Sequence, residues 1–120
     1  MGDYRDLAGY QKAFTLAMDI FTMAKKFPPE EKYSLTDQLR RSSRSVCANI
    51  AEAYKRRRYK NYFVSRLSDA QAENAETQVW LDFALACGYL EKHEYEQLSE
   101  KNDEAARLIF YMINNPLKFI

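Results

Sequence analysis

The chain has 120 residues, of which 47% are hydrophobic and 29% are charged. This length suits one domain with a real core, and the even spread of apolar residues excludes an intrinsically disordered chain. The net charge of +1 conceals two halves of opposite sign, because residues 32–66 carry ten Lys or Arg against two acids and residues 67–106 carry two Lys against ten acids. Such an asymmetry predicts electrostatic contact, either with nucleic acid or with another copy of the chain.

Only three Gly and three Pro interrupt the sequence, a composition typical of long helices joined by short turns. The first helix is expected over residues 7–26, with Asp6 as its N-cap and Pro28 beyond its end. Apolar positions at steps of three and four predict its buried face. These positions are Leu7, Tyr10, Phe14, Ala17, Phe21 and Ala24.

The second helix is expected over residues 35–56, with Ser34 as its N-cap and Asp37 completing a capping box. A helix running unbroken to residue 87 would be roughly 80 Å long, which exceeds a compact domain of this size. A break is therefore expected around residues 56–60, with Asn61 as the cap candidate. The third helix then covers residues 61–87 and ends at Gly88, a C′ residue suited to the left-handed conformation.

The fourth helix is expected over residues 92–115, where Pro116 ends it. Its N-terminus carries Glu91 and Glu94, which suit the positive end of the helix dipole. Short connections place successive helices antiparallel. The sequence therefore predicts an all-α protein, a single antiparallel up-and-down four-helix bundle over residues 1–120. Cys47 and Cys87 lie in apolar helical patterns and are expected to be buried thiols rather than a disulfide.

The chain shows no pattern typical of secretion or membrane insertion. Its N-terminus lacks a basic segment followed by an apolar one, and no run of 18 apolar residues occurs. We expect a cytoplasmic protein that does not contact a membrane.

Several linked motifs resemble one protein family. Residues 27–35 read FPPEEKYSL, residues 38–41 read QLRR, Ser45 precedes Val46, and residues 49–52 read NIAE. Further along, residues 76–78 read ETQ and residues 88–90 read GYL. This series is similar to the signature of the four-helix bundle proteins encoded in 23S rRNA intervening sequences.

The resemblance covers nearly the whole chain and implies more than a fold. Relatives include the accessory variability determinant of diversity-generating retroelements. The resemblance therefore implies a ring-shaped homopentamer, and nucleic-acid binding in some members. A protein such as a reverse transcriptase is a candidate partner that the sequence alone does not identify. The chain departs from the family where a glycine and a capping serine usually follow NIAE, because a basic segment that begins at Ala53 and Tyr54 replaces them. Cys47 also stands where the family often has proline.

That basic segment carries the candidate nucleic-acid site. Residues 54–62 read YKRRRYKNY and interleave five cations with three tyrosines. Lys and Arg neutralise phosphates, and tyrosine rings stack on unpaired bases. The predicted phosphate contacts are Lys55, Arg56, Arg57, Arg58 and Lys60, with Arg40, Arg41 and Arg44 as supplementary contacts. The predicted stacking partners are Tyr54, Tyr59 and Tyr62. The alternative is a solvated turn that only keeps one end of the bundle soluble.

A second interpretation assigns the charges to assembly. Arg40, Arg41 and Arg44 are expected beside acidic positions of the third helix, either within one protomer or between protomers. A positive face on one subunit and a negative face on the next would close into a ring. The candidate interface residues are Glu73, Glu76, Trp80 and Phe83, and simple core packing remains the alternative for the two aromatics.

No catalytic or cofactor-binding constellation is present in the sequence. The usual di-iron bundle site needs two Glu-x-x-His pairs, and His93 is the only histidine. That histidine is expected at the surface. No Gly-x-Ser-x-Gly motif or glycine-rich phosphate loop occurs. We expect no enzyme activity, no metal and no cofactor, and we expect Asn49 and Glu52 to be buried and to fix the register of the helices.

Overall fold

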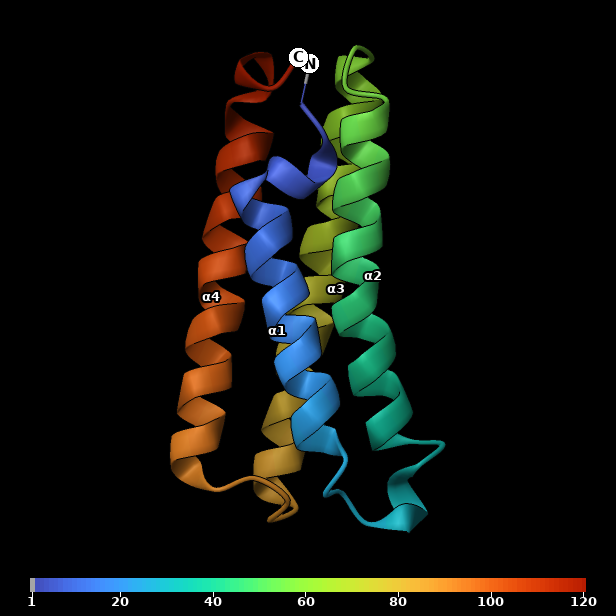
Figure 1. Ribbon diagram of the computed structural model, residues 1–120, viewed down its shortest axis with the longest axis vertical. Helices are drawn as coiled ribbons and strands as arrows, with labels where there is room; N and C mark the ends of the chain where they lie inside the picture. The colour runs from blue at the N-terminus through green and yellow to red at the C-terminus, as the bar shows by residue number, and fades with distance from the viewer. Residues whose placement is uncertain (1) are drawn as a thin grey trace.

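The computed structural model describes residues 2–120 and confirms the antiparallel up-and-down four-helix bundle (Figure 1). Its helices are α1 (Ala8–Ala24), α2 (Leu35–Lys55), α3 (Lys60–Ala86) and α4 (Lys92–Asn114). Single 3₁₀ turns η1 (Tyr4–Asp6), η2 (Pro29–Glu31) and η3 (Pro116–Lys118) precede α1, precede α2 and follow α4. The bundle measures 44 × 25 × 19 Å.

Each helix packs against two neighbours, and the order around the bundle is α1, α2, α3, α4. Helices α2 and α4 are therefore diagonal and lie on opposite sides, with α1 in front of α3 in Figure 1. The α2–α3 turn and both chain termini lie at the same end, whereas the α1–α2 and α3–α4 connections lie at the other. The basic segment thus occupies one end of an elongated molecule.

The core-facing side of α1 differs from the predicted stripe. Its buried residues are Gly9, Ala13, Leu16, Ala17, Ile20 and Ala24. Gly9 faces α4, where a Cβ built on it would lie at an ordinary contact distance of 3.6 Å from the Cβ of Leu108. Small side chains fill the centre of this contact, so the bulky aromatics lie at its margins. Phe14, predicted to be buried, is 50% exposed, and Phe21 is half-buried.

A layer of buried polar residues links helices across the core. The side-chain amide of Asn74 in α3 donates to Oδ1 of Asn102 in α4 at 2.9 Å. The amide of Asn102 donates to the backbone oxygen of Asn74 at 3.1 Å. The hydroxyl of Thr77 in α3 donates to Ser42 Oγ in α2 at 2.9 Å. Because buried amides and hydroxyls are costly without partners, these bonds favour one register of α3 against its neighbours.

The predicted N-caps of α1 and α2 differ in the structure. Leu7 occupies the N-cap position of α1, and Asp6 belongs to the preceding turn η1. Ser34 does occupy the N-cap position of α2, but its side chain does not cap the helix. The carboxylate of Glu31 accepts instead from the Leu35 N–H at 3.2 Å and from the Ser34 hydroxyl at 2.6 Å. A residue of the 3₁₀ turn therefore replaces the expected capping box.

The turn between α3 and α4 follows the sequence prediction. Gly88 has φ +79°, and the Tyr89 N–H donates to the Ala84 oxygen at 2.9 Å, which forms a Schellman motif. Helix α4 begins with a capping box in which Glu91 and Glu94 bind each other's backbone N–H groups. The two cysteines are free, but only Cys47 is buried. Cys87, predicted to be buried, is exposed because it lies at the C-terminal end of α3.

Candidate nucleic-acid interface

The α2–α3 turn forms without glycine. The N–H groups of Arg56 and Arg57 donate to Ala53 and Tyr54 at 3.2 and 3.3 Å, which tightens the end of α2. The Tyr59 N–H then donates to the Arg56 oxygen at 2.9 Å. Helix α3 begins at Lys60 with Tyr59 in the N-cap position, so Asn61 is not its cap. Such a tight turn holds consecutive cationic side chains at one end of the bundle.

The turn and the adjoining helix ends present five cations, which we name the basic turn cluster: Lys55, Arg56, Arg57, Arg58 and Lys60. Within residues 2–120, none of the five pairs with a carboxylate. Four are exposed, and Arg57 is half-buried, with its guanidinium donating to the Tyr54 oxygen at 2.9 Å. The cluster therefore keeps its positive charge available to a ligand.

The three tyrosines of this segment are partly covered by arginines. The guanidinium carbon of Arg57 lies 4.0 Å from the ring centre of Tyr54, and that of Arg58 lies 5.1 Å from the ring centre of Tyr59. The guanidinium carbon of Arg56 lies 5.3 Å from the ring centre of Tyr62. Tyr54 and Tyr62 are half-buried, whereas Tyr59 is 55% exposed. Tyr59 therefore offers the largest free ring surface of the three.

The supplementary arginines of α2 do not share one environment. Arg40 donates to the Phe21 oxygen at 3.1 Å and stacks over the Phe21 ring at 4.7 Å. Arg44 is exposed and makes no ion pair within the described chain. Both line a hollow of about 650 Å³ on the outer side of α2. Arg40 is thus fixed to α1 by a hydrogen bond, whereas Arg44 only lies over the same Phe21 ring at 5.7 Å.

Arg41 is neutralised within the chain. Its guanidinium lies 2.8 Å from the carboxylate of Glu76 and 3.4 Å from that of Glu73, both in α3. The hydrogen bond to Glu76 is the main reason why the pKa of Arg41 is raised. Glu73 and Glu76 were predicted at an oligomer interface. In the structure they instead form ion pairs with Arg41 of the same copy.

Trp80 and Phe83, the other predicted interface residues, lie together on α3 with ring centres 5.9 Å apart. Phe83 is 53% exposed and Trp80 is half-buried. Both line a hollow of about 370 Å³ together with Leu35 of α2. This pair is thus available at the surface and also packed against the core.

A further ion pair between α2 and α3 was not predicted. Arg66 binds Glu52 at 2.7 Å and Asp69 at 2.9 Å. Glu52, expected to be buried, is therefore exposed, and its role is to link two helices at the surface. Asn49 is half-buried and donates to the Ser45 oxygen of its own helix at 3.0 Å. Only the helix rotation, which the sequence pattern leaves open, brings Glu52 to Arg66.

Residues 2–120 contain neither a metal-binding cluster nor a membrane-spanning helix. This part of the chain has no group of three His, Cys, Asp or Glu side chains with the proximity needed for a metal ion. His93 is exposed, and its Nδ1 lies 3.3 Å from the carboxylate of Glu91. None of the four helices is both long enough and apolar enough to cross a bilayer.

Comparisons with known proteins agree with this architecture. The chain matches the family described as 23S rRNA-intervening sequence protein over residues 5–111. A crystal structure of a protein of unknown function from the S23 ribosomal protein family of Bacteroides thetaiotaomicron is similar, with a TM-score of 0.83 and 27% sequence identity. That similarity covers 92% of this chain and 99% of the other. No curated protein matches the chain.

Proposed function

Because the chain belongs to the family of 23S rRNA-intervening sequence proteins, we propose that it is a non-enzymatic, self-associating bundle that binds RNA or DNA. The basic turn cluster is the proposed binding surface. The observation that carries this proposal is the contrast among the cations. Arg41 and Arg66 bind carboxylates of the same chain, whereas the cluster has no such partner in the described residues.

The proposed interaction is mainly electrostatic. Cations that neutralise phosphates release condensed counterions, and this release supplies most of the affinity of sequence-independent binding. Tyr59 adds a stacking surface for an unpaired base. The cluster lies in a turn, and no recognised docking helix or strand accompanies it, so we propose backbone recognition rather than base readout.

A fluorescence anisotropy titration tests the proposal. Labelled single-stranded and structured RNA and DNA are titrated at low and physiological salt, with light scattering on the same sample. If all five cations contact phosphates, the logarithm of the association constant should fall with that of the salt concentration with a slope of about −3.5 for single strands. Binding that does not respond to salt, or no binding at low salt, would contradict the proposal.

Charge reversal locates the surface. Arg56→Glu combined with Arg57→Glu should abolish binding and leave the light-scattering mass unchanged. A matched control changes the charge equally at the opposite end, through Lys25→Glu with Lys92→Glu, where both side chains are exposed. The control should bind almost as well as the wild type, apart from its altered net charge. Equal loss in both variants would argue against the basic turn cluster.

The second candidate function is a purely structural homo-oligomer whose charges serve assembly. The surface pair Trp80 and Phe83, with ring centres 5.9 Å apart and Phe83 53% exposed, favours it, whereas Arg41, Glu73 and Glu76 already pair within one copy. An oligomer that dissociates when Arg56 and Arg57 are reversed, without binding nucleic acid, would favour this function. The partner would then be another protein, such as a reverse transcriptase, or none.

A further inference from the structure

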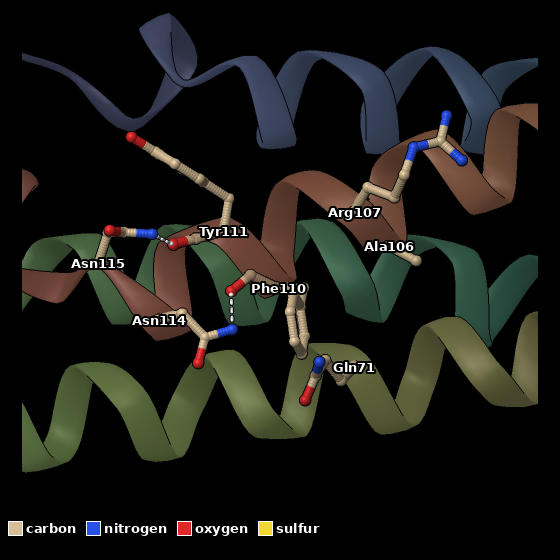
Figure 2. Close-up of a pocket in the computed structure, with 7 residues that line it drawn as sticks. All are labelled: Gln71, Ala106, Arg107, Phe110, Tyr111, Asn114 and Asn115. Carbon is tan, nitrogen blue, oxygen red and sulfur yellow. Dashed lines mark hydrogen bonds between the residues drawn. The ribbon is translucent and has the colours of Figure 1, made fainter.

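Two surface hollows of the bundle are lined by aromatic rings, and their charges differ. The hollow of about 580 Å³ in Figure 2 lies on α4, where Phe110 is directed toward Gln71 of α3 and the exposed Arg107 lines the same space. Within residues 2–120, no carboxylate lines it. The hollow of about 370 Å³ beside Trp80 is lined instead by the carboxylate of Glu31 and, in the same part of the chain, by no cation. Only this second hollow suits a positively charged ligand.

The second hollow, which we name the Trp80 hollow, lies at the end of the bundle opposite the basic turn cluster. Its lining includes Glu31, Tyr33, Gln38, Trp80 and Phe83. The rings of Trp80 and Phe83 are inclined at 38°, and Tyr33 is 85% exposed. Aromatic faces attract cations through the quadrupole of the ring. Large exposed rings gathered on one surface are also typical of a protein contact.

The carboxylate of Glu31 is held in place by three hydrogen-bond donors. Its Oε1 accepts from the Ser34 hydroxyl at 2.6 Å and from the Leu35 N–H at 3.2 Å. Its Oε2 accepts from the Tyr89 hydroxyl at 2.9 Å. The hydrogen bonds from Ser34, Tyr89 and Leu35 lower the pKa of Glu31, so this group is negatively charged at neutral pH.

This negative charge has no partner in the described part of the chain. No cation of residues 2–120 forms an ion pair with Glu31. Lys32 lies instead over the Tyr33 ring, with its Nζ 5.3 Å from the ring centre. Arg41 donates to Gln38 at 3.1 Å, but two glutamates of α3 already neutralise its charge. The Trp80 hollow thus combines an unpaired carboxylate with aromatic faces.

The acceptor positions of Glu31 distinguish an ammonium group from a guanidinium group. A carboxylate offers about four acceptor positions, and three donors already occupy those of Glu31. One position therefore remains, on Oε2. A guanidinium binds a carboxylate best through two parallel hydrogen bonds, whereas an ammonium is a compact charge that needs only one acceptor. The remaining position favours a primary ammonium.

We propose that the Trp80 hollow binds the side chain of a lysine carried by a partner protein, with the ammonium on Glu31 and the methylene stem against Trp80 and Phe83. Lysine stems pack on apolar surface while the charged head binds elsewhere. A polypeptide is favoured over a free amine, because the exposed rings of Tyr33 and Phe83 offer contact area that a small amine would leave uncovered. This inference goes beyond the proposed function and uses a surface separate from the basic turn cluster.

A fluorescence titration tests the proposed ligand, because Trp80 is the only tryptophan of the protein. The wild type is titrated with three blocked tripeptides that differ only in their central residue, which is lysine, arginine or norleucine, and with n-butylammonium. The lysine peptide should change the emission of Trp80 with a dissociation constant on the order of 1 mM. The norleucine peptide should bind about tenfold more weakly, and the arginine peptide and n-butylammonium each about threefold more weakly.

Three results of this titration would overturn the proposal. Equal binding of the lysine and norleucine peptides would show that the charge does not matter. Tighter binding of the arginine peptide, or no change in emission up to about 20 mM lysine peptide, would refute the assignment to lysine. Tighter binding of n-butylammonium than of the lysine peptide would replace the partner protein by a free amine.

Matched variants locate the site. Glu31→Gln should weaken binding of the lysine peptide about tenfold, because it removes the charge from the hydrogen bond. Glu30→Gln is the control, since it makes the same change of net charge at an exposed neighbour that does not line the hollow; binding should stay within about twofold of the wild type. Phe83→Leu keeps an apolar side chain and should weaken binding about threefold. Circular dichroism checks the helices, and equal losses in Glu30→Gln and Glu31→Gln would contradict the site.

Light scattering on the same samples separates this inference from the second candidate function, in which Trp80 and Phe83 meet another copy. A mass that is unchanged at saturation with the lysine peptide supports a free hollow. A mass that falls in parallel with binding would overturn the inference in favour of a self-contact through these two rings. Glu31→Gln should bind nucleic acid as the wild type does, so failure of the basic turn cluster would leave the Trp80 hollow unaffected.

Discussion

Replacing the buried Asn102 by alanine tests how strongly the polar layer stabilises the bundle. Asn102 is 2% exposed, and Asn74 is 6% exposed. Asn102→Ala removes the bond from Asn74 at 2.9 Å and the bonds donated to the Asn74 oxygen at 3.1 Å and to Gln78 Oε1 at 3.3 Å. The Asn74 amide keeps its bond to the backbone oxygen of residue 102 at 3.2 Å.

The magnitude follows from these three lost bonds. At about 0.5–1.5 kcal/mol of net stability for each, Asn102→Ala should lower the free energy of unfolding by about 1.5–4.5 kcal/mol. A domain of this size has roughly 6–18 kcal/mol in total, so the variant should remain folded. Urea unfolding followed by circular dichroism, at one fixed protein concentration, gives the difference from the shift in midpoint.

A control on the same helix separates the buried layer from general helix effects. Asn114 is exposed, and its amide donates only to the Phe110 oxygen at 3.1 Å. Asn114→Ala should change the free energy of unfolding by less than about 0.5 kcal/mol. In addition, Asn74→Ala combined with Asn102→Ala should cost less than the two single changes together, because both remove the same bonds. Equal effects at 102 and 114 would refute the reasoning.

Three further measurements address local features. Gly88→Ala should lower the free energy of unfolding by about 1 kcal/mol, because φ is +79° and the space around the position is open, so only backbone strain acts; no loss in thermal unfolding would contradict this. Burial raises the pKa of Cys47 to about 11, so a thiol reagent at neutral pH should modify the exposed Cys87 and spare Cys47 until the protein unfolds, and mass spectrometry distinguishes the two. The hydrogen bond from Ser34 is the main cause that lowers the pKa of Glu31 below 4.5; the stability it contributes is present above that pH and lost as the pH falls through the lowered value. The difference in stability between the wild type and Glu31→Gln should therefore shrink on acidification, and a constant difference would refute the assignment.

The candidate site could be predicted only in part from the sequence. The basic turn cluster was predicted from five cations in seven consecutive residues, and its position at a turn followed from the length limit on one helix. The absence of carboxylate partners for this cluster could not be predicted from the sequence. Arg41 looks as available as Arg44 in the sequence, yet Glu76, 35 residues away, neutralises only Arg41.

The exposure of Phe14 and Phe110 escaped sequence analysis for a related reason. Phe14 fitted a helical stripe and was predicted to be buried, but the rotation of α1 in the bundle directs Ala13, Leu16 and Ala17 inward instead. Phe110 follows the buried Ile109 and lies outside the stripe of α4. The position of Phe110 outside the apolar stripe was the one sequence signal of its exposure. This signal is weak, because α4 carries other apolar residues beside it.

The sequence by itself determined the features that depend on neighbouring residues. The scarcity of Gly and Pro, the apolar periodicity and Gly88 define four helices and their turns, because backbone geometry and capping act over a few residues. Only the tertiary structure decided which charges are paired and which aromatics are exposed. Those properties depend on the rotation and approach of each helix, which long-range packing of buried residues such as Leu16, Ser42 and Asn102 sets.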